Sequence, residues 1–183
     1  CTCQALIHGL IMGNKKIKMI KVANAPCSWG VIEKTFESER CGDYRSVLDE
    51  IQETGFTGTE LGDWGFMPTD PLLLKDALDQ RGFSLVGSWV TSVLIDRNGH
   101  EDSANRALQS AGLLSAVSGT KPLIILGDNL FAYEPRNRVA GQVTSQDSMT
   151  TDQWGVFIDG LQLIARQVKE DTGIRTVFHH HGS

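Results

Sequence analysis

Residues 70–90 read DPLLLKDALDQRGFSLVGSWV, and this stretch decides the predicted fold because it holds a helix and a strand in direct succession. Asp70 followed by Pro71 is a typical helix start, since Asp caps the first backbone N–H groups and Pro suits the first helical position. The expected apolar stripe of this helix consists of Leu72, Leu73, Ala77 and Leu78. Gly82 ends the helix. Residues 84–90 then predict a strand.

The same alternation of helix and strand extends in both directions from this unit. The expected strands are residues 16–23, 57–61, 84–90, 123–126 and 175–179. The other expected helices are residues 44–54, 103–118 and 151–172, the last capped by Gly173. No hairpin signal separates the strands. Such alternation predicts an α/β fold with a parallel sheet covered by helices.

Two architectures fit this pattern, a doubly wound sheet and a (β/α)8 barrel. No GxGxxG or GxxxxGK[ST] motif follows the first strand, which disfavours the common nucleotide-binding doubly wound folds. A complete barrel takes about 250 residues. We therefore expect a partial (β/α)8 TIM barrel with roughly strands 1–5 and helices 1–4, its C-terminal part missing. Residues 1–16 are expected to be an N-terminal extension, and residues 17–183 the truncated barrel domain of an N-terminal fragment.

Composition excludes several classes of partner. Hydrophobic residues make up 40% of the chain, which is enough for a core, and the formal net charge is −5. The longest basic run is Lys15-Lys16, so a phosphate-binding surface for nucleic acid is not expected. No apolar stretch reaches the roughly 20 residues of a membrane-spanning helix. Cys27 and Cys41 lie in separate segments and fit reduced thiols, which predicts a cytoplasmic protein.

Candidate site residues gather where the expected strands end, because active sites of barrels lie at that face. Glu60 occupies the last turn of an apolar strand, where a carboxylate is costly unless it meets a cation, a metal or substrate hydroxyls; the alternative is a solvated strand end. Asn24 and Trp29 follow the first strand, as the floor of a sugar-sized pocket or as a rigid turn with a core plug. Trp64 and Trp89 follow the second and third strands.

Three consecutive histidines end the fifth strand, in the sequence Val177-Phe178-His179-His180-His181. Alternate side chains of a strand point to opposite faces, so His179 and His181 are expected to point together into the barrel mouth. Imidazole serves as a metal ligand, as a hydrogen-bond donor or as an acid or base near neutral pH. The alternative is the remnant of a purification tag.

Four motifs in this order resemble a known family. They are NAPCSWG (24–30), TGTELG (57–62), LVGSW (85–89) and VFHHHG (177–182), and together they are similar to the sugar phosphate isomerase/epimerase superfamily, nearest to its inosose dehydratases. The resemblance implies a xylose isomerase-like TIM barrel and a reaction that moves a proton next to a carbonyl. It implies a divalent metal in the complete protein, Mn²⁺ or Co²⁺ first and Mg²⁺ or Zn²⁺ as alternatives.

The resemblance also sets the expected roles. Glu60, His179 and His181 are the candidate catalytic residues, whereas the candidate substrate-binding residues are Asn24, Trp29, Trp64, Trp89 and His180. The family's metal ligands are expected beyond Ser183, so we expect no tightly bound metal and no activity in this chain alone. The expected activity of the parent is dehydration of a keto-inositol or related keto sugar. The alternatives are a sugar isomerase or epimerase of the same superfamily and a non-catalytic sugar-binding barrel. A homo-oligomer is a further expectation for the parent protein.

Overall fold

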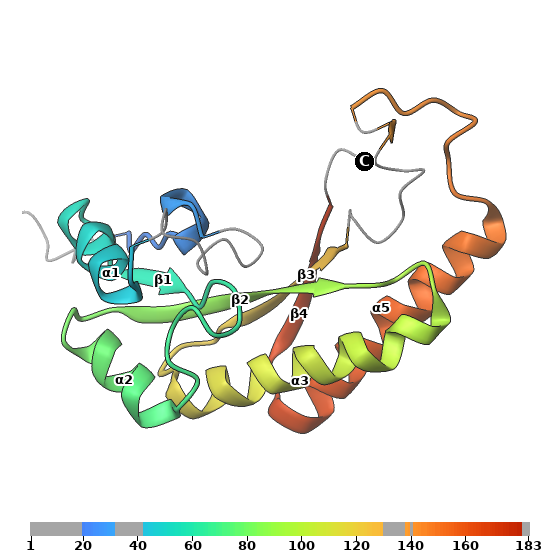
Figure 1. Ribbon diagram of the computed structural model, residues 1–183. Coiled ribbons are helices and arrows are strands. Elements are labelled where there is room, and N and C mark those ends of the chain that lie inside the picture. The colour runs from blue at the N-terminus through green and yellow to red at the C-terminus, as the bar shows by residue number, and fades with distance from the viewer. Residues whose placement is uncertain (1–19, 32–41, 130–137, 140, 181–183) are drawn as a thin grey trace, which may run out of the picture.

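The computed structural model describes residues 20–31, 42–129, 138–139 and 141–180 (Figure 1). A four-stranded parallel sheet in the order β1-β2-β3-β4 forms its centre, as the alternating pattern predicts. The strands are β1 (Gly58–Glu60), β2 (Ser84–Ser92), β3 (Leu123–Asp128) and β4 (Arg175–His179). The α-helices are α1 (Tyr44–Glu53), α2 (Pro71–Asp79), α3 (His100–Val117) and α5 (Thr151–Thr172). Two short 3-10 helices are η1 (Pro26–Trp29) and η3 (Arg97–Gly99).

The first predicted strand differs from the structure. Of residues 16–23, only 20–23 are described, and they are not assigned to a strand. An isolated parallel bridge joins Asn24 to Thr59 instead, flanked by hydrogen bonds from Thr57 N to Val22 O (2.9 Å) and from Glu60 N to Asn24 O (2.9 Å). The segment therefore runs beside β1, and its pairing is short because β1 itself has three residues.

Where a helix begins or ends at a capping residue, the observed limit agrees closely with the limit predicted from the sequence. The Asp70 carboxylate accepts hydrogen bonds from Leu72 N and Leu73 N at 2.9 and 3.0 Å and begins α2. A capping box of Thr150 and Gln153 begins α5, and Gly173 ends it in the left-handed conformation (φ 73°). Helix α3 begins three residues before the predicted Ser103, directly after η3.

The apolar stripe predicted for α2 is partly wrong. Leu72 and Leu73 are 79% and 62% exposed, and the helix buries Leu74, Ala77 and Leu78. These three residues are spaced i, i+3, i+4 and lie on one face, whereas Leu72 and Leu73 in the first turn lie on the other. Because three leucines follow one another at positions 72–74, the sequence alone did not show which of them faces the core.

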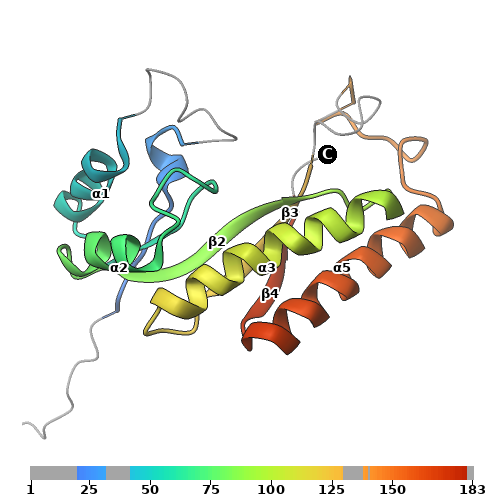
Figure 2. The same ribbon diagram turned by 60° about the horizontal axis from the view of Figure 1, so that its bottom comes forward.

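Helices α3 and α5 lie side by side along one face of the sheet (Figures 1 and 2). The layer between them and the sheet is fully buried and aliphatic; it includes Leu114, Ile124, Leu126, Ile164 and Val168. Burying each such side chain contributes about 1.5–3 kcal/mol. Because α3 and α5 cover one face of the sheet, the side chains on the opposite face of β2, β3 and β4 point away from these helices. Among the described residues, no helix is both long and apolar enough to cross a membrane.

Candidate active site at the carboxyl ends of the strands

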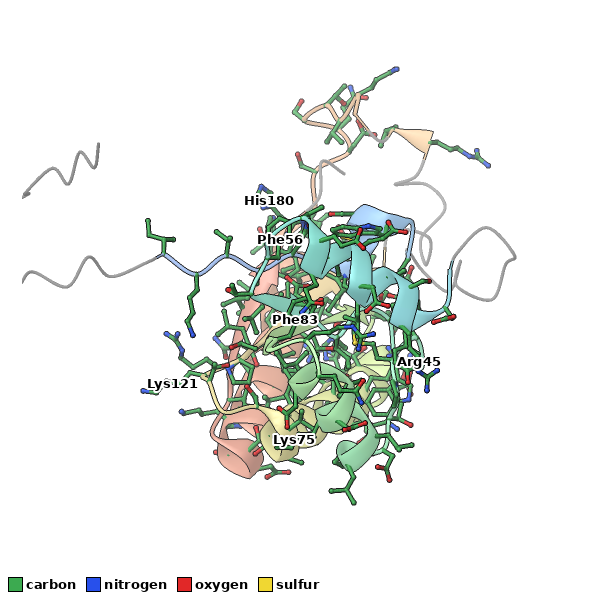
Figure 3. The ribbon with its side chains drawn as sticks, turned by 90° about the vertical axis from the view of Figure 1, so that its left-hand side faces the viewer. Arg45, Phe56, Lys75, Phe83, Lys121 and His180 are labelled. Carbon is green, nitrogen blue, oxygen red and sulfur yellow. The ribbon has the colours of Figure 1, made fainter. Side chains whose placement is uncertain are left out.

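The candidate site lies at the end of the sheet where the parallel strands finish. Glu60 is the last residue of β1 and His179 the last residue of β4. In Figure 3, His180, which follows β4, lies well above Lys121, which precedes β3. In a barrel of parallel strands, this carboxyl end is where functional side chains gather.

Strand register places the key side chains on the face away from α3 and α5. Thr91, Gly127 and His179 are successive partners across β2, β3 and β4, so they share one row and one face. Trp89 is two residues before Thr91 and faces the same way. Phe178 faces the helices instead, where its ring meets Phe157 of α5 edge-on at 5.3 Å.

Glu60 joins this face from β1. Its partner in β2 is Gly87, which lies on the same side as Trp89, and its backbone N–H donates to Asn24 O. Burial raises the pKa of the Glu60 carboxyl above its usual value, and the positive charge of His179 opposes part of that rise. Two of the predicted catalytic residues, Glu60 and His179, therefore lie within the range of each other's charge, although they come from different strands of the sheet.

The Trp89 side chain packs beside that of His179. The indole and imidazole rings meet edge-on, with centroids 5.4 Å apart and planes at 77°. The indole N–H donates to Thr91 Oγ1 at 3.1 Å. An indole fixed next to an imidazole suits a site for a small polar ligand, because an aromatic face packs against C–H bonds.

In the loop after residues 20–23, the side chain of Asn24 hydrogen-bonds to residues close to it in the sequence. Its Oδ1 accepts hydrogen bonds from Ala25 N (2.8 Å) and from Ser28 Oγ (3.0 Å), and so shapes the turn into η1. Trp29 at the end of η1 is partly buried and packs against the core, which corresponds to the core-plug alternative. The substrate-binding roles of Asn24 and Trp29 remain predictions.

The other candidates are more peripheral. Trp64, in the turn after β1, is 38% exposed, and His180 is exposed beyond the end of β4. His181 lies outside the described residues, so the expected pairing of its ring with that of His179 stays a prediction. The thiol of Cys27 is free and exposed, as expected of a reduced cysteine.

The described residues do not fit a divalent metal by themselves. Within these residues, no group of three or more His, Cys, Asp or Glu side chains is placed to hold an ion. Glu60 and His179 offer one oxygen and one nitrogen donor, fewer than a protein-bound transition metal takes. The chemistry proposed below therefore uses the side chains of this chain only.

Sequence reasoning missed Gly127, which the structure places at the centre of the site. The predicted strand ended at Leu126, where the apolar run stops, but pairing continues to Asp128 because Ser92 and Asp128 are partners in the ladder. The strand 84–90 was likewise two residues too short. A glycine at the end of a buried strand was the available signal, since it often marks close approach of another group.

Comparisons with known proteins agree with the sequence motifs. No family model matches the chain. It is 27% identical over 169 residues to an inosose dehydratase of Salmonella typhimurium, covering 90% of this chain and 52% of that protein. An inosose dehydratase of Geobacillus thermodenitrificans is 25% identical over 173 residues, with 91% and 53% covered. The chain thus spans about half the length of these curated relatives.

A solved structure shares the fold. The apo crystal structure of 3-keto-D-glucoside 4-epimerase from E. coli superposes with a TM-score of 0.53 and 17% identity, over 74% of this chain and 50% of that one. The likeness confirms the predicted part of a TIM-barrel-like α/β fold. Together, the relatives and this neighbour support sugar-modifying enzymes as the class of protein. By its motifs, its relatives and its fold, the chain resembles members of the xylose isomerase-like sugar phosphate isomerase/epimerase superfamily.

Proposed function

We propose that this chain supplies an acid–base pair, Glu60 and His179, to an enzyme that dehydrates a keto-inositol or a related keto sugar. The observation that carries the proposal is the placement of a partly buried carboxyl, with its pKa raised by burial, in electrostatic contact with an imidazole at the mouth of the sheet. Perturbed titratable groups paired in this way are typical of acid–base sites.

Dehydration next to a ketone needs two proton transfers. A base removes the proton from the carbon alpha to the carbonyl, and the electron pair of that C–H bond forms an enolate. As the enolate returns to the ketone, a C=C bond forms between the alpha and beta carbons. The β-hydroxyl leaves with the electrons of its C–O bond and takes a proton from an acid, so that one water is released. A carboxyl with a raised pKa keeps its proton closer to neutral pH and suits the acid, whereas neutral imidazole suits the base. We assign these roles to Glu60 and His179, with His181 as a further candidate.

The neighbouring rings are proposed to shape the substrate pocket. Trp89 offers an aromatic edge beside His179, and Trp29, Trp64, Asn24 and His180 are the further candidate contacts. The substrate is proposed to be a small keto sugar, and the protein is proposed to be a cytoplasmic homo-oligomer. The resemblance to the superfamily implies a divalent metal in the complete protein, Mn²⁺ or Co²⁺ first and Mg²⁺ or Zn²⁺ as alternatives.

A second candidate function is isomerisation or epimerisation of a keto sugar. The structural likeness to a 3-keto-D-glucoside 4-epimerase favours it. The same two side chains would serve, with the proton returned to carbon rather than the hydroxyl expelled. The two reactions differ in mass balance, because only dehydration releases water.

The test measures turnover by the protein at its natural length. Mass spectrometry of the products from an inosose and from a 3-keto-glucoside distinguishes loss of water from isomerisation. We expect Glu60→Gln to lower kcat/KM at least tenfold, which is about 1.4 kcal/mol of transition-state stabilisation. Glu50→Gln, an exposed position on α1, is the matched control and leaves kcat/KM unchanged. Equal kinetics for the Glu60 variant and wild type would place Glu60 outside the site.

A further inference from the structure

Trp89 is held against the backbone of Gly127 more closely than any side chain there would allow. A Cβ atom built on Gly127 would lie 1.9 Å from both Cη2 and Cζ2 of the indole. Real Cβ contacts under 3.0 Å are essentially never seen. Glycine at this point of β3 is therefore required for the indole to cross the strand.

Two further restraints act on the same ring. The hydrogen bond from Nε1 to Thr91 Oγ1 (3.1 Å) ties the polar edge of the indole to its own strand. The benzo edge extends across Gly127 toward β4, where the ring meets the imidazole of His179. The indole thus extends from β2 across β3 to β4, where it meets Thr91, Gly127 and His179 respectively.

We propose that Trp89 is a positioning residue, whose indole, seated on Gly127 and tied to Thr91, fixes the orientation of the His179 imidazole toward Glu60. An imidazole at the end of a strand otherwise turns about two side-chain torsions, χ1 and χ2. The edge-on contact with the indole restricts both rotations. The use of this orientation in catalysis rests on the proposed function. The orientation itself is measurable without substrate.

The orientation is tested through the charge interaction between His179 and Glu60. In the natural-length protein with ¹³C-labelled glutamate, NMR follows the Glu60 carboxyl carbon as pH varies. His179→Gln removes the opposing positive charge, so it should raise the pKa of Glu60. We expect the same substitution to have less than half this effect in a Gly127→Ala background, because the added methyl displaces the indole and frees the imidazole.

Two other variants make the result decisive. Gly155→Ala adds the same methyl where nothing lies within 4 Å, so His179→Gln should keep its full effect in that background. Thr91→Val removes only the acceptor oxygen of the indole N–H, and it replaces Gly127→Ala if that variant does not fold. It should also weaken the effect of His179→Gln.

These measurements distinguish an error about the positioning role of Trp89 from an error about the proposed function. If His179→Gln shifts the Glu60 pKa equally in wild type and in every folded variant at Gly127 or Thr91, Trp89 does not position His179. A loss of kcat/KM in Glu60→Gln would then still support the acid–base pair. In the natural-length protein, Thr91→Val should lower kcat and leave KM within about twofold, since it alters proton transfer rather than binding.

Discussion

At the scale of single residues, the charged carboxyl of Glu60 destabilises the fold, but a carboxyl in this position suits the proposed proton transfer. Its carboxyl is partly desolvated at the end of β1, and its charged form is disfavoured there. Natural proteins keep such groups mainly where chemistry needs them, because a neutral residue of the same shape is easier to bury. The partial compensation by His179 comes from a strand more than a hundred residues later in the chain.

This cost predicts a pH-dependent gain in stability for Glu60→Gln. The pKa of Glu60 is raised in the folded state, so its contribution to stability is greatest below the unfolded value near 4.5 and is lost as pH rises through the folded value. Glutamine carries no charge at any pH. We therefore expect Glu60→Gln to be more stable than wild type at pH 7 and to lose that advantage below the unfolded pKa.

Urea denaturation at both pH values measures this difference in the free energy of unfolding. Exposed Glu50 on α1 provides the control, since Glu50→Gln should show no comparable pH-dependent gain. A Glu60→Gln chain that is less stable than wild type at pH 7 would show that the carboxylate is more favourably paired than its burial indicates.

At the scale of elements, α3 and α5 are joined by a buried histidine. His100 begins α3, is 6% exposed, and hydrogen-bonds through Nε2 to Leu94 O at 2.9 Å. Its ring rests on Gly160 of α5, where an added Cβ would lie 2.7 Å from Nε2. The close packing of the two helices that cover the sheet therefore depends on a glycine in the middle of α5.

Gly160→Ala should lower the free energy of unfolding by roughly 1–3 kcal/mol, because the methyl overlaps the imidazole and strains its hydrogen bond. In the same helix, Gly155→Ala should raise the free energy of unfolding by about 0.5–1 kcal/mol, since alanine is the better helix former and meets open space. Chemical denaturation of the two variants checks both signs. Equal gains would mean that the His100 contact does not constrain α5.

At the scale of the whole molecule, the sheet has an exposed margin at β4. Among the described residues, β4 pairs with β3 alone, and Val177 and Phe178 are 40% and 38% exposed. A strand with free backbone groups and apolar side chains is a template for pairing with another chain. The chain spans about half the length of these curated relatives and of the solved neighbour.

We expect the 183-residue chain to self-associate at micromolar concentration through this margin. Val177→Lys should shift sedimentation toward monomer, because a lysine on an edge strand opposes pairing. Leu72→Lys, an equally apolar and more exposed position on α2, is the control and should leave association unchanged. A wild-type chain that sediments as a single monomeric species would contradict the prediction.

Local signals in the sequence determined most of the elements of this protein. Thr150 and Gly173 bound α5, and the β-rich run after it forms β4 with the predicted limits, because caps and turns act through neighbouring residues. The alternation of helix and strand likewise predicted the parallel sheet, and the motifs predicted the superfamily. Glu60 and His179 were recognisable as candidates from their places at strand ends.

Only the tertiary structure decided which side chains meet. The register of β2, β3 and β4 places Trp89 on Gly127 and beside His179, and that register depends on residues far apart in the chain. The same packing turns Leu72 and Leu73 outward and extends the strands past their apolar runs to Ser92 and Asp128. Periodicity reports which residues prefer burial, whereas the partners that bury them are set by long-range pairing.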